Sequence, residues 1–587
     1  MPDWDGNNGS RTSIILAATQ SQSFQAEVTI LKDRPIANMT AEEVPIPGTV
    51  HLIDLEGTMQ ATHGSGENRD TILIPAPTDD PNDPLTWSPR RKLLALSCMI
   101  AYMMAVGVST AAMYSVFGDI QANSSLTLDN LNQGTGYMFL LLGWGCLFWQ
   151  PFALQFGKRP TYLISVLGTM GTMIWAPYTT SNAQWIASKI LQGFFGAPIE
   201  SLCEITITDL YYTHQRGFYT AIYALSLSGS NLSAPIISGF IATGQGWRWF
   251  WCAILCAVVF VFLFFFMEET NFVRLHVQAS VAAVTIEEEK RRESTSVETP
   301  ADNKNSAVTG TNAGSTDTSE LDDTVSQRKP KTYLTKLQLW QKEDLEKENQ
   351  FWGMVKRPLI YFRFPVIVFC GFYYGSSLVW FNVLNATSAL ILSGTYGFST
   401  SMVGVSYIAP LLGVFVGAAY TGIWGNKFTL SMARKRGGIL ESEYRLWLLT
   451  PAIILLPFGL ILWGVGSSRG IHWFGAVFAA FVVSGASAIS VQGMCNYCIE
   501  SYRALSGEAI VTVILIRNTM SFAIGYGVTP WVQNLGHQNA FIVAAAAGMV
   551  QCATVLIMIW KGKSLRKKSA ARYAQYVEKM AAVGMAH

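Results

Sequence analysis

The sequence predicts an all-α polytopic membrane protein in which twelve transmembrane helices form two six-helix halves. Apolar stretches of about twenty residues recur from Lys92 to Trp560, and a hydrocarbon core of about 30 Å needs roughly 20 apolar residues per crossing. Lys and Arg collect in every second gap between these stretches, as they do in cytoplasmic loops. One long polar loop divides the stretches six and six.

The composition is that of a chain embedded in lipid. Of 587 residues, 50% are hydrophobic and 14% are charged, whereas soluble domains carry about 25% charged residues. The formal net charge of +2 gives no reason to expect a nucleic-acid partner. All nine cysteines lie inside or at the ends of apolar stretches, so we expect buried thiols rather than disulfides or metal ligands. No cofactor and no metal site is predicted.

The predicted spans form two sets of six. The first six are Lys92–Phe117, Thr135–Phe156, Thr161–Tyr178, Trp185–Thr208, Phe218–Ile241 and Trp249–Met267. The second six are Phe362–Val383, Ser401–Trp424, Leu446–Val465, Trp473–Tyr497, Ala509–Val528 and Ala540–Trp560. Basic gaps alternate with almost uncharged gaps only if the number of spans is even. Both termini and the middle loop are therefore predicted to be cytoplasmic.

These limits divide the chain into five regions. Residues 1–91 form a largely disordered cytoplasmic tail, 92–267 the N-terminal six-helix half, 268–361 a largely disordered cytoplasmic central loop, 362–560 the C-terminal six-helix half, and 561–587 a basic cytoplasmic tail. The disorder predictions rest on composition, because both regions are polar and poor in aromatic residues. A cytoplasmic join between two six-span halves is what a pair of parallel repeats requires.

Two ionisable residues lie deep in the fourth span. A charge at membrane depth costs roughly 3 kcal/mol on insertion scales, so each such residue is a functional hypothesis. Lys189 and Glu200 are eleven positions apart, which returns them to the same helix face, with Gln192, roughly 16 Å apart along the axis. Because burial disfavours a charged carboxyl, we expect Glu200 to load and unload a proton. Glu204 and Asp209 are expected to be ordinary hydrated carboxylates.

Arg517 lies near the middle of the eleventh span. Arg cannot shed its charge, so it must face a cavity or a carboxylate, as a functional group or as a structural pair. Aromatic and amide side chains inside the spans predict a wet substrate cavity, although many such side chains simply pack or face lipid. The predicted lining is Gln192, Trp144, Tyr223, Tyr373, Trp380, Asn382, Asn496 and Asn518, with Tyr374 beside them.

The fifth span carries a row of small residues around a proline. From Gly229 to Gly239 it reads Gly-Ser-Asn-Leu-Ser-Ala-Pro-Ile-Ile-Ser-Gly. Small residues let helices approach closely, and Pro235 permits a bend. The row resembles the fifth-span antiporter pattern of the major facilitator superfamily, which is Gly, four residues, Gly-Pro, two residues, Gly-Gly. Ala234 and Ser238 stand in place of two of its glycines.

Two further patterns carry this resemblance. It covers the chain from about residue 81 to residue 560. It is strongest to the fungal branch of the twelve-span drug:proton antiporters. The fourth-span pattern Arg-x-x-Gln-Gly appears with Lys189 in place of the Arg. The loop signature after span two matches at Gly157, Lys158 and Arg159, but Leu154 stands where the family has an Asp. An echoing set follows span eight: Gly422, Asn426 and Lys427.

The resemblance implies an alternating-access carrier with its site between the two halves. It implies proton-driven export of a hydrophobic or amphipathic small molecule, such as a drug, toxin or secondary metabolite, by a monomer. Glu200 would carry the proton, with Lys189 and Arg517 assisting. The implied helix seam is Gly229, Ala234, Pro235 and Gly239, and the implied cytoplasmic gate is Gly157, Lys158, Arg159, Gly422, Asn426 and Lys427.

Three other interpretations stay open: a proton-driven importer of a small cation such as a polyamine, a nutrient receptor, and a membrane-embedded enzyme. The enzyme would need a nucleophile and base or metal ligands at membrane depth, and all seven His residues lie in loops, tails or span ends. Glycan acceptor triplets begin at Asn123 and Asn385, in or beside predicted external gaps. We expect the plasma membrane, with the vacuolar membrane as the alternative.

Overall fold

Helix forms within each of the predicted apolar spans. The computed structural model describes residues 46–51, 80–248, 251–272, 332–336, 338–340, 349–435 and 439–582. The disorder predicted for most of the N-terminal tail and the central loop falls on residues 1–45, 52–79 and 273–331, which lie outside the described residues.

The N-terminal half begins with a 3₁₀ turn, η3 (Pro84–Thr86), in front of the first long helix. Its helices are α2 (Pro89–Ala111), η4 (Tyr114–Val116), α3 (Phe117–Asn123), α4 (Leu128–Trp144), α5 (Cys146–Phe156), α6 (Lys158–Trp175), η5 (Ala176–Tyr178), α7 (Asn182–Gly196), α8 (Pro198–Leu210), α9 (Thr213–Gln245) and α10 (Trp251–Phe266). The central loop contributes α13 (Tyr333–Lys336) and α15 (Phe351–Ile360).

The C-terminal half is built in the same way. Its helices are η6 (Tyr361–Arg363), α16 (Pro365–Gly394), α17 (Thr400–Ser406), α18 (Ile408–Ala419), η7 (Tyr420–Trp424), α19 (Gly425–Lys435), η8 (Ser442–Leu449), α20 (Ala452–Ile461), η9 (Leu462–Gly466), α21 (Trp473–Ser501), η10 (Arg503–Leu505) and α22 (Ser506–Ala582). Two short strands, β1 (Thr49–His51) and β2 (Ile439–Glu441), form an antiparallel ribbon.

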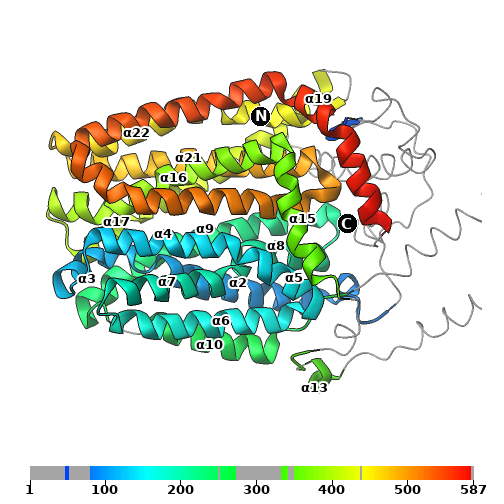
Figure 1. Cartoon of the computed structure of the whole chain (residues 1–587), viewed down its shortest axis with the longest axis horizontal. Coiled ribbons are helices and arrows are strands. Elements are labelled where there is room, and N and C mark those ends of the chain that lie inside the picture. The colour runs from blue at the N-terminus through cyan, green and yellow to red at the C-terminus, as the bar shows by residue number, and fades with distance from the viewer. Residues whose placement is uncertain are drawn as a thin grey trace, which may run out of the picture.

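Seven helical stretches of the described chain are long and apolar enough to cross a membrane. The longest lies in α22, where the backbone leaves the helical conformation at Gly536 with a φ of 72°, a conformation that favours glycine. Figure 1 shows the chain reversing direction along α22. The helix α10 is apolar but shorter than these stretches. The all-α membrane fold is thus confirmed, and the number of twelve crossings rests on the sequence pattern.

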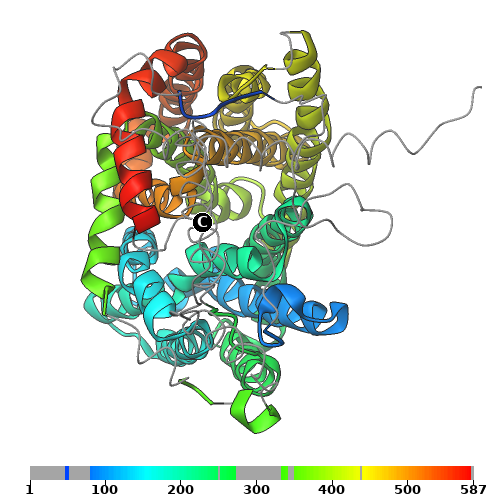
Figure 2. The ribbon, with the colours of Figure 1, turned by 90° about the vertical axis from the view of Figure 1, so that its right-hand side faces the viewer.

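The helices lie side by side, so the bundle has two ends (Figure 1). We call the end that carries α5, α15, the β1–β2 ribbon and the last turns of α22 the loop end, and the opposite end, with α3 and α17, the far end. Figure 2 looks from the loop end and shows the early helices and the late helices as two groups. Each group has its own apolar core. A large core that includes Trp185 and Tyr407, called the shared core below, joins the halves, and so does a small one that includes Trp149 and Val511.

Helix is interrupted for one residue within the second predicted span and for one residue within the fourth, and both residues keep helical φ and ψ. Gly145 separates α4 from α5, and Ala197 separates α7 from α8 just before Pro198. The two breaks touch: a Cβ added to Gly145 would lie 2.8 Å from the Ala197 Cβ, and Cys146 Sγ donates to the Ala197 carbonyl over 3.4 Å. Glycine at the first break therefore permits the close approach of the second and fourth spans.

The predicted glycan at Asn385 is wrong. The seventh span was expected to end at Val383, but α16 continues to Gly394. Asn385 lies inside this helix and is 5% exposed, so it is out of reach of a glycosylating enzyme. Asn123 lies at the last turn of α3, and its side chain is exposed. Its glycosylation stays a prediction.

Candidate functional site

An ion pair joins the two halves inside the bundle. Glu200 on α8 pairs through Oε2 with Nη2 of Arg517 on α22, and the two residues are 9% and 5% exposed. Nη1 of Arg517 donates to the Tyr374 hydroxyl on α16 over 2.7 Å, and the guanidinium carbon lies 5.0 Å from the centre of that ring. Counted along their helices at 1.5 Å per residue, Glu200 and Arg517 each lie about 15 Å from the loop end.

This pair satisfies a requirement that the sequence sets for Arg517. A buried guanidinium needs a carboxylate, and removing one partner of such a pair typically costs about 3–5 kcal/mol. The backbone of Glu200 is also held, because the Tyr223 hydroxyl on α9 donates to its carbonyl over 3.3 Å. Two of the three residues predicted for proton coupling thus lie together, and they come from opposite halves.

Lys189, the third predicted coupling residue, lies elsewhere. It is 2% exposed, and its Nζ donates to Gln192 Oε1 over 2.8 Å and lies 4.8 Å from the centre of the Trp185 ring. Gln192 in turn donates to the Ser109 carbonyl on α2 over 2.9 Å. Lys189 on α7 and Glu200 on α8 have different partners, so the expected assistance of Lys189 at Glu200 stays a prediction. Among the described residues no carboxylate pairs with Lys189.

Glu204 lies one turn beyond Glu200 on α8 and is partly exposed. No ion pair to Glu204 occurs within the described part of the chain. Asp209, further along the same helix, pairs with Lys158. Within the described residues, Glu204 thus has no cationic partner, whereas Glu200 and Asp209 on the same helix each have one.

The predicted cavity residues divide into two groups. Trp144 on α4 is exposed and donates to the Thr519 hydroxyl of the other half over 3.0 Å. Its neighbour Gly143 faces Asn518, which is 1% exposed, and a Cβ there would lie 2.6 Å from the Asn518 Cβ. Trp144 and Gly143 thus contact the chain neighbours of Arg517, whereas Tyr223 and Tyr374 contact the Glu200–Arg517 pair itself. Asn382 and Asn496 are partly exposed.

Two predicted lining residues pack in cores instead. Tyr373 is fully buried in the core of the C-terminal half, and Trp380 is 8% exposed in the shared core. Consecutive positions on a helix point about 100° apart, so only Tyr374 of the Tyr373–Tyr374 pair reaches Arg517. Gln192 is 1% exposed and accepts a hydrogen bond from Lys189, so it does not line an open cavity.

The predicted seam of the fifth span contacts the other half. A Cβ added to Gly404 on α17 would lie 2.7 Å from the Pro235 carbonyl and 3.3 Å from the Gly239 Cα. Ala234 is fully buried in the shared core, whereas a Cβ at Gly229 would meet no atom within 4 Å. Gly229 therefore does not belong to this close contact.

A second glycine contact joins α4 to α22. A Cβ added to Gly525 would lie 2.8 Å from the Gly136 Cα. Nearby, Asn132 Nδ2 donates to the Thr529 hydroxyl over 2.9 Å. Both glycine contacts lie in the part of the bundle toward the far end, so the halves are held together there.

The predicted gate residues of the N-terminal half tie three of its helices together at the loop end. Gly157, with a φ of 111°, immediately precedes α6. Lys158 pairs with Asp209, and Arg159, fully buried, donates to the Met267 carbonyl over 2.9 Å and to the Phe264 carbonyl over 2.7 Å. Lys427 is exposed. Gly422 lies in η7 with open space around its Cα, and the Asn426 side chain lies outside the described residues.

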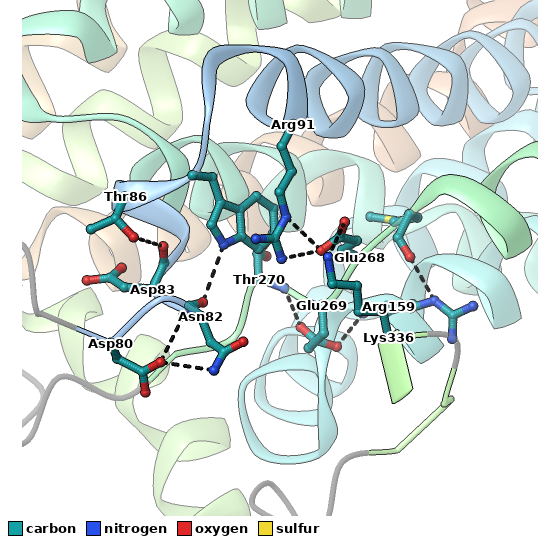
Figure 3. Close-up of polar contacts among 12 residues, drawn as sticks. Asp80, Asn82, Asp83, Thr86, Arg91, Arg159, Glu268, Glu269, Thr270 and Lys336 are labelled. Carbon is teal, nitrogen blue, oxygen red and sulfur yellow. Dashed lines mark hydrogen bonds and ion pairs between the residues drawn. The ribbon is translucent and has the colours of Figure 1, made fainter. Parts of the chain in front are cut away.

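Glu269 supplies the carboxylate that the loop signature lacks at Leu154. It accepts hydrogen bonds from the backbone nitrogens of Lys158 and Arg159 over 3.0 and 2.9 Å, at the positive end of α6. Figure 3 shows Glu269 beside Arg159, with Glu268 between Arg91 and Lys336. Sequence reasoning missed this role, although two adjacent acidic residues at the end of an apolar span were the available signal.

Chemically, the site combines a buried carboxylate–guanidinium pair with two tyrosine side chains. Among the described residues no group of three or more His, Cys, Asp or Glu side chains is placed to hold a metal ion.

Comparisons with known proteins agree with this architecture. An uncharacterized MFS-type transporter of Schizosaccharomyces pombe, C1271.10c, is 28% identical over 91% of this chain and 94% of its own length. Protein HOL1 of Saccharomyces cerevisiae is 25% identical over 91% of this chain and 97% of its own. The MFS antiporter QDR3 of Candida albicans is 22% identical over 80% and 78%.

The fold matches solved transporters. The proton:xylose symporter XylE, bound to 6-bromo-6-deoxy-D-glucose, superposes with a TM-score of 0.53 at 12% identity, covering 81% of this chain and 96% of XylE. The sequence profile of the Major Facilitator Superfamily matches residues 93–530, which is most of the chain and includes both Glu200 and Arg517. The chain therefore belongs to the Major Facilitator Superfamily of transporters.

Proposed function

We propose that this transporter is a proton-coupled secondary carrier that exports hydrophobic or amphipathic small molecules by alternating access. The observation that carries the proposal is the Glu200–Arg517 pair between the two halves. When the halves part at this depth, Glu200 loses its cation and can accept a proton. When they close, Arg517 displaces the proton. The pair thus links proton binding to the tilt of the halves.

The distribution of charge supports the proposed orientation. Lys and Arg side chains collect at the loop end, which supports a cytoplasmic position for that end and for both termini. The glycine contacts Gly239–Gly404 and Gly136–Gly525 close the far end, which supports an arrangement shut toward the outside. The proposed setting is a monomer in the plasma membrane.

The surroundings of the pair support an amphipathic substrate. Tyr223 and Tyr374 offer aromatic surface beside the ion pair, and aromatic groups with polar tips suit ligands with one apolar and one polar side. The fifth-span pattern and the likeness to an MFS antiporter support export.

A second candidate is a proton-driven importer of a small organic cation. The observation that favours it is Glu204, a partly exposed carboxyl with no ion pair in the described chain. A carboxylate of this kind attracts an ammonium group, and its location beside Glu200 would let a proton and a cation use neighbouring sites.

Flux measurements on purified protein in proteoliposomes test both proposals. Rhodamine 6G serves as the lipophilic probe and radiolabelled spermidine as the small cation. Export by antiport predicts probe accumulation when the vesicle interior is acidic, whereas import by symport predicts spermidine accumulation when the exterior is acidic. Glu200→Gln should abolish proton-driven transport in a folded protein. Full transport by this variant would reject the role of Glu200, and ligand binding without flux would indicate a receptor.

A further inference from the structure

We infer that the loop end of the C-terminal half carries a peptide-binding site whose ligand is the chain's own segment Ile46–His51. This segment lies 38 positions before the first long helix, in a tail that the sequence predicts to be disordered, yet it forms the strand β1. β1 pairs antiparallel with β2, with Thr49 opposite Glu441 and His51 opposite Ile439. The segment therefore adds a strand to the loop between α19 and η8.

A buried arginine recognises the backbone of the segment. Arg566, fully buried on the last part of α22, uses Nε and Nη2 to bind the Glu443 carboxylate, with 2.8 Å from Nε to Oε1. Its Nη1 donates to the Pro47 carbonyl and lies 3.4 Å from the Thr49 hydroxyl. Since Glu443 neutralises the charge, Arg566 offers the peptide a directed donor. Without the peptide this buried donor loses its acceptor.

At position 48 of the segment, the site accepts only glycine. Gly48 has a φ of 79°, and an added Cβ would lie 2.6 Å from Ser442 Oγ, 2.8 Å from the Glu500 carbonyl and 2.9 Å from Arg566 Nη1. The Ser442 hydroxyl also donates to the Gly48 carbonyl over 2.9 Å. Both the backbone conformation and the space exclude a side chain. The recognised feature is thus a Pro-Gly turn, closed by a hydrogen bond from Thr49 N to the Ile46 carbonyl over 3.3 Å, that leads into an added strand.

The same tail is anchored to the N-terminal half. Asp83 caps η3, Lys92 Nζ donates to the Leu85 carbonyl over 2.9 Å, and Arg91 pairs with Glu268 while its guanidinium lies 3.8 Å from the Trp87 ring centre (Figure 3). One tail thereby contacts both halves at the loop end.

The linker between the two anchors sets how they are coupled. Residues 52–79 connect them along the chain, and a stretch of about 28 residues can span at most roughly 95 Å. This linker keeps the segment near its site at an effective concentration of about a millimolar. The site is therefore occupied in cis, and a variant that blocks docking leaves it free for a peptide added in trans.

A cross-linking experiment on the full-length protein tests the docked register. Val50→Cys with Leu440→Cys places two thiols at facing positions of the ribbon, and mild oxidation should give a disulfide-linked peptide on digestion and mass spectrometry. Adding Gly48→Val should lower the rate of disulfide formation at least tenfold, whereas Gly57→Val, elsewhere in the tail, should not. Equal cross-linking with and without Gly48→Val, or cross-links between two chains, would overturn the inference.

A binding experiment tests the site itself. A fluorescein-labelled peptide with the sequence of residues 44–53 should bind the Gly48→Val protein saturably. It should bind the wild-type protein at least tenfold more weakly, because the site of that protein is already occupied. The same peptide carrying Gly48→Val should not bind either. Failure of the wild-type peptide to bind a monodisperse Gly48→Val protein would overturn the inference, whatever the outcome of the transport assays.

Discussion

The carboxylate of Glu200 lies against the guanidinium of Arg517, 317 positions away along the chain and in the other half of the molecule. Because both groups are buried, the attraction between their charges offsets the free-energy cost of removing each from water. Their contact therefore reports on how closely the two halves approach at this depth.

We predict strong coupling between these two residues in stability. Glu200→Ala and Arg517→Ala should each lower the free energy of unfolding by about 3–5 kcal/mol, because each leaves a buried charge without its partner. The double variant should cost much less than the sum of the two. Thermal unfolding in detergent measures all four proteins, and additive losses would contradict a direct pair.

We predict that Gly404→Val impairs transport by forcing α17 away from α9. The new Cβ would lie 2.7 Å from the Pro235 carbonyl, and backbone at that distance cannot yield without moving the helix. Gly229→Val is the matched control, since a Cβ there meets nothing within 4 Å. Initial rates of proton-driven flux should fall at least tenfold for Gly404→Val and change less than twofold for Gly229→Val. Equal rates would show that the far-end contact is dispensable.

We predict that Glu269→Gln destabilises the loop end of the N-terminal half. The carboxylate accepts from four backbone nitrogens, those of Lys158, Arg159, Thr270 and Asn271, over 2.9–3.0 Å. An amide cannot accept on both of its polar atoms, so a loss of about 1–3 kcal/mol is expected. Glu441→Gln, which alters a pair with the exposed Lys563, should cost under about 1 kcal/mol. Thermal unfolding compares the two variants, and equal losses would refute the capping role.

We predict a single glycan acceptor among the two candidate triplets. Asn123→Gln should remove the endoglycosidase-sensitive shift in gel mobility, because Asn123 is exposed at the far end, which is proposed to face outward. Asn385→Gln should leave that shift unchanged. A shift that persists in Asn123→Gln would place the acceptor elsewhere or reverse the orientation.

Much of the fold could be predicted, because apolar runs and alternating charge are local properties of the sequence. The end of the seventh span could not. Its last turns contain Asn385, Thr387 and Ser388, which look like a loop. Thr387 and Ser388 instead donate to the Val383 and Asn385 carbonyls of their own helix, both over 2.8 Å, so helix continues through polar residues.

The sequence identified which residues belong to the candidate site, but it did not identify which of them contact each other. Glu200 and Arg517 stand out as charges at membrane depth, yet their partnership depends on how two separately packed halves meet. Lys189 shows the converse, because it stands out as a charge in the same span, yet its contacts are to Gln192 and Trp185 of its own helix. The docked segment around Gly48 was missed because a three-residue strand in a polar tail has too weak a pattern to distinguish from a turn.

The position of Arg566 extends the folded unit beyond the last apolar stretch. A chain shortened after Trp560 would retain every predicted membrane crossing and still lose the anchor for a segment near the opposite terminus. A change near the carboxyl terminus would therefore alter the packing of a segment near the amino terminus. Tags or deletions at the carboxyl end should be chosen so that they preserve Arg566.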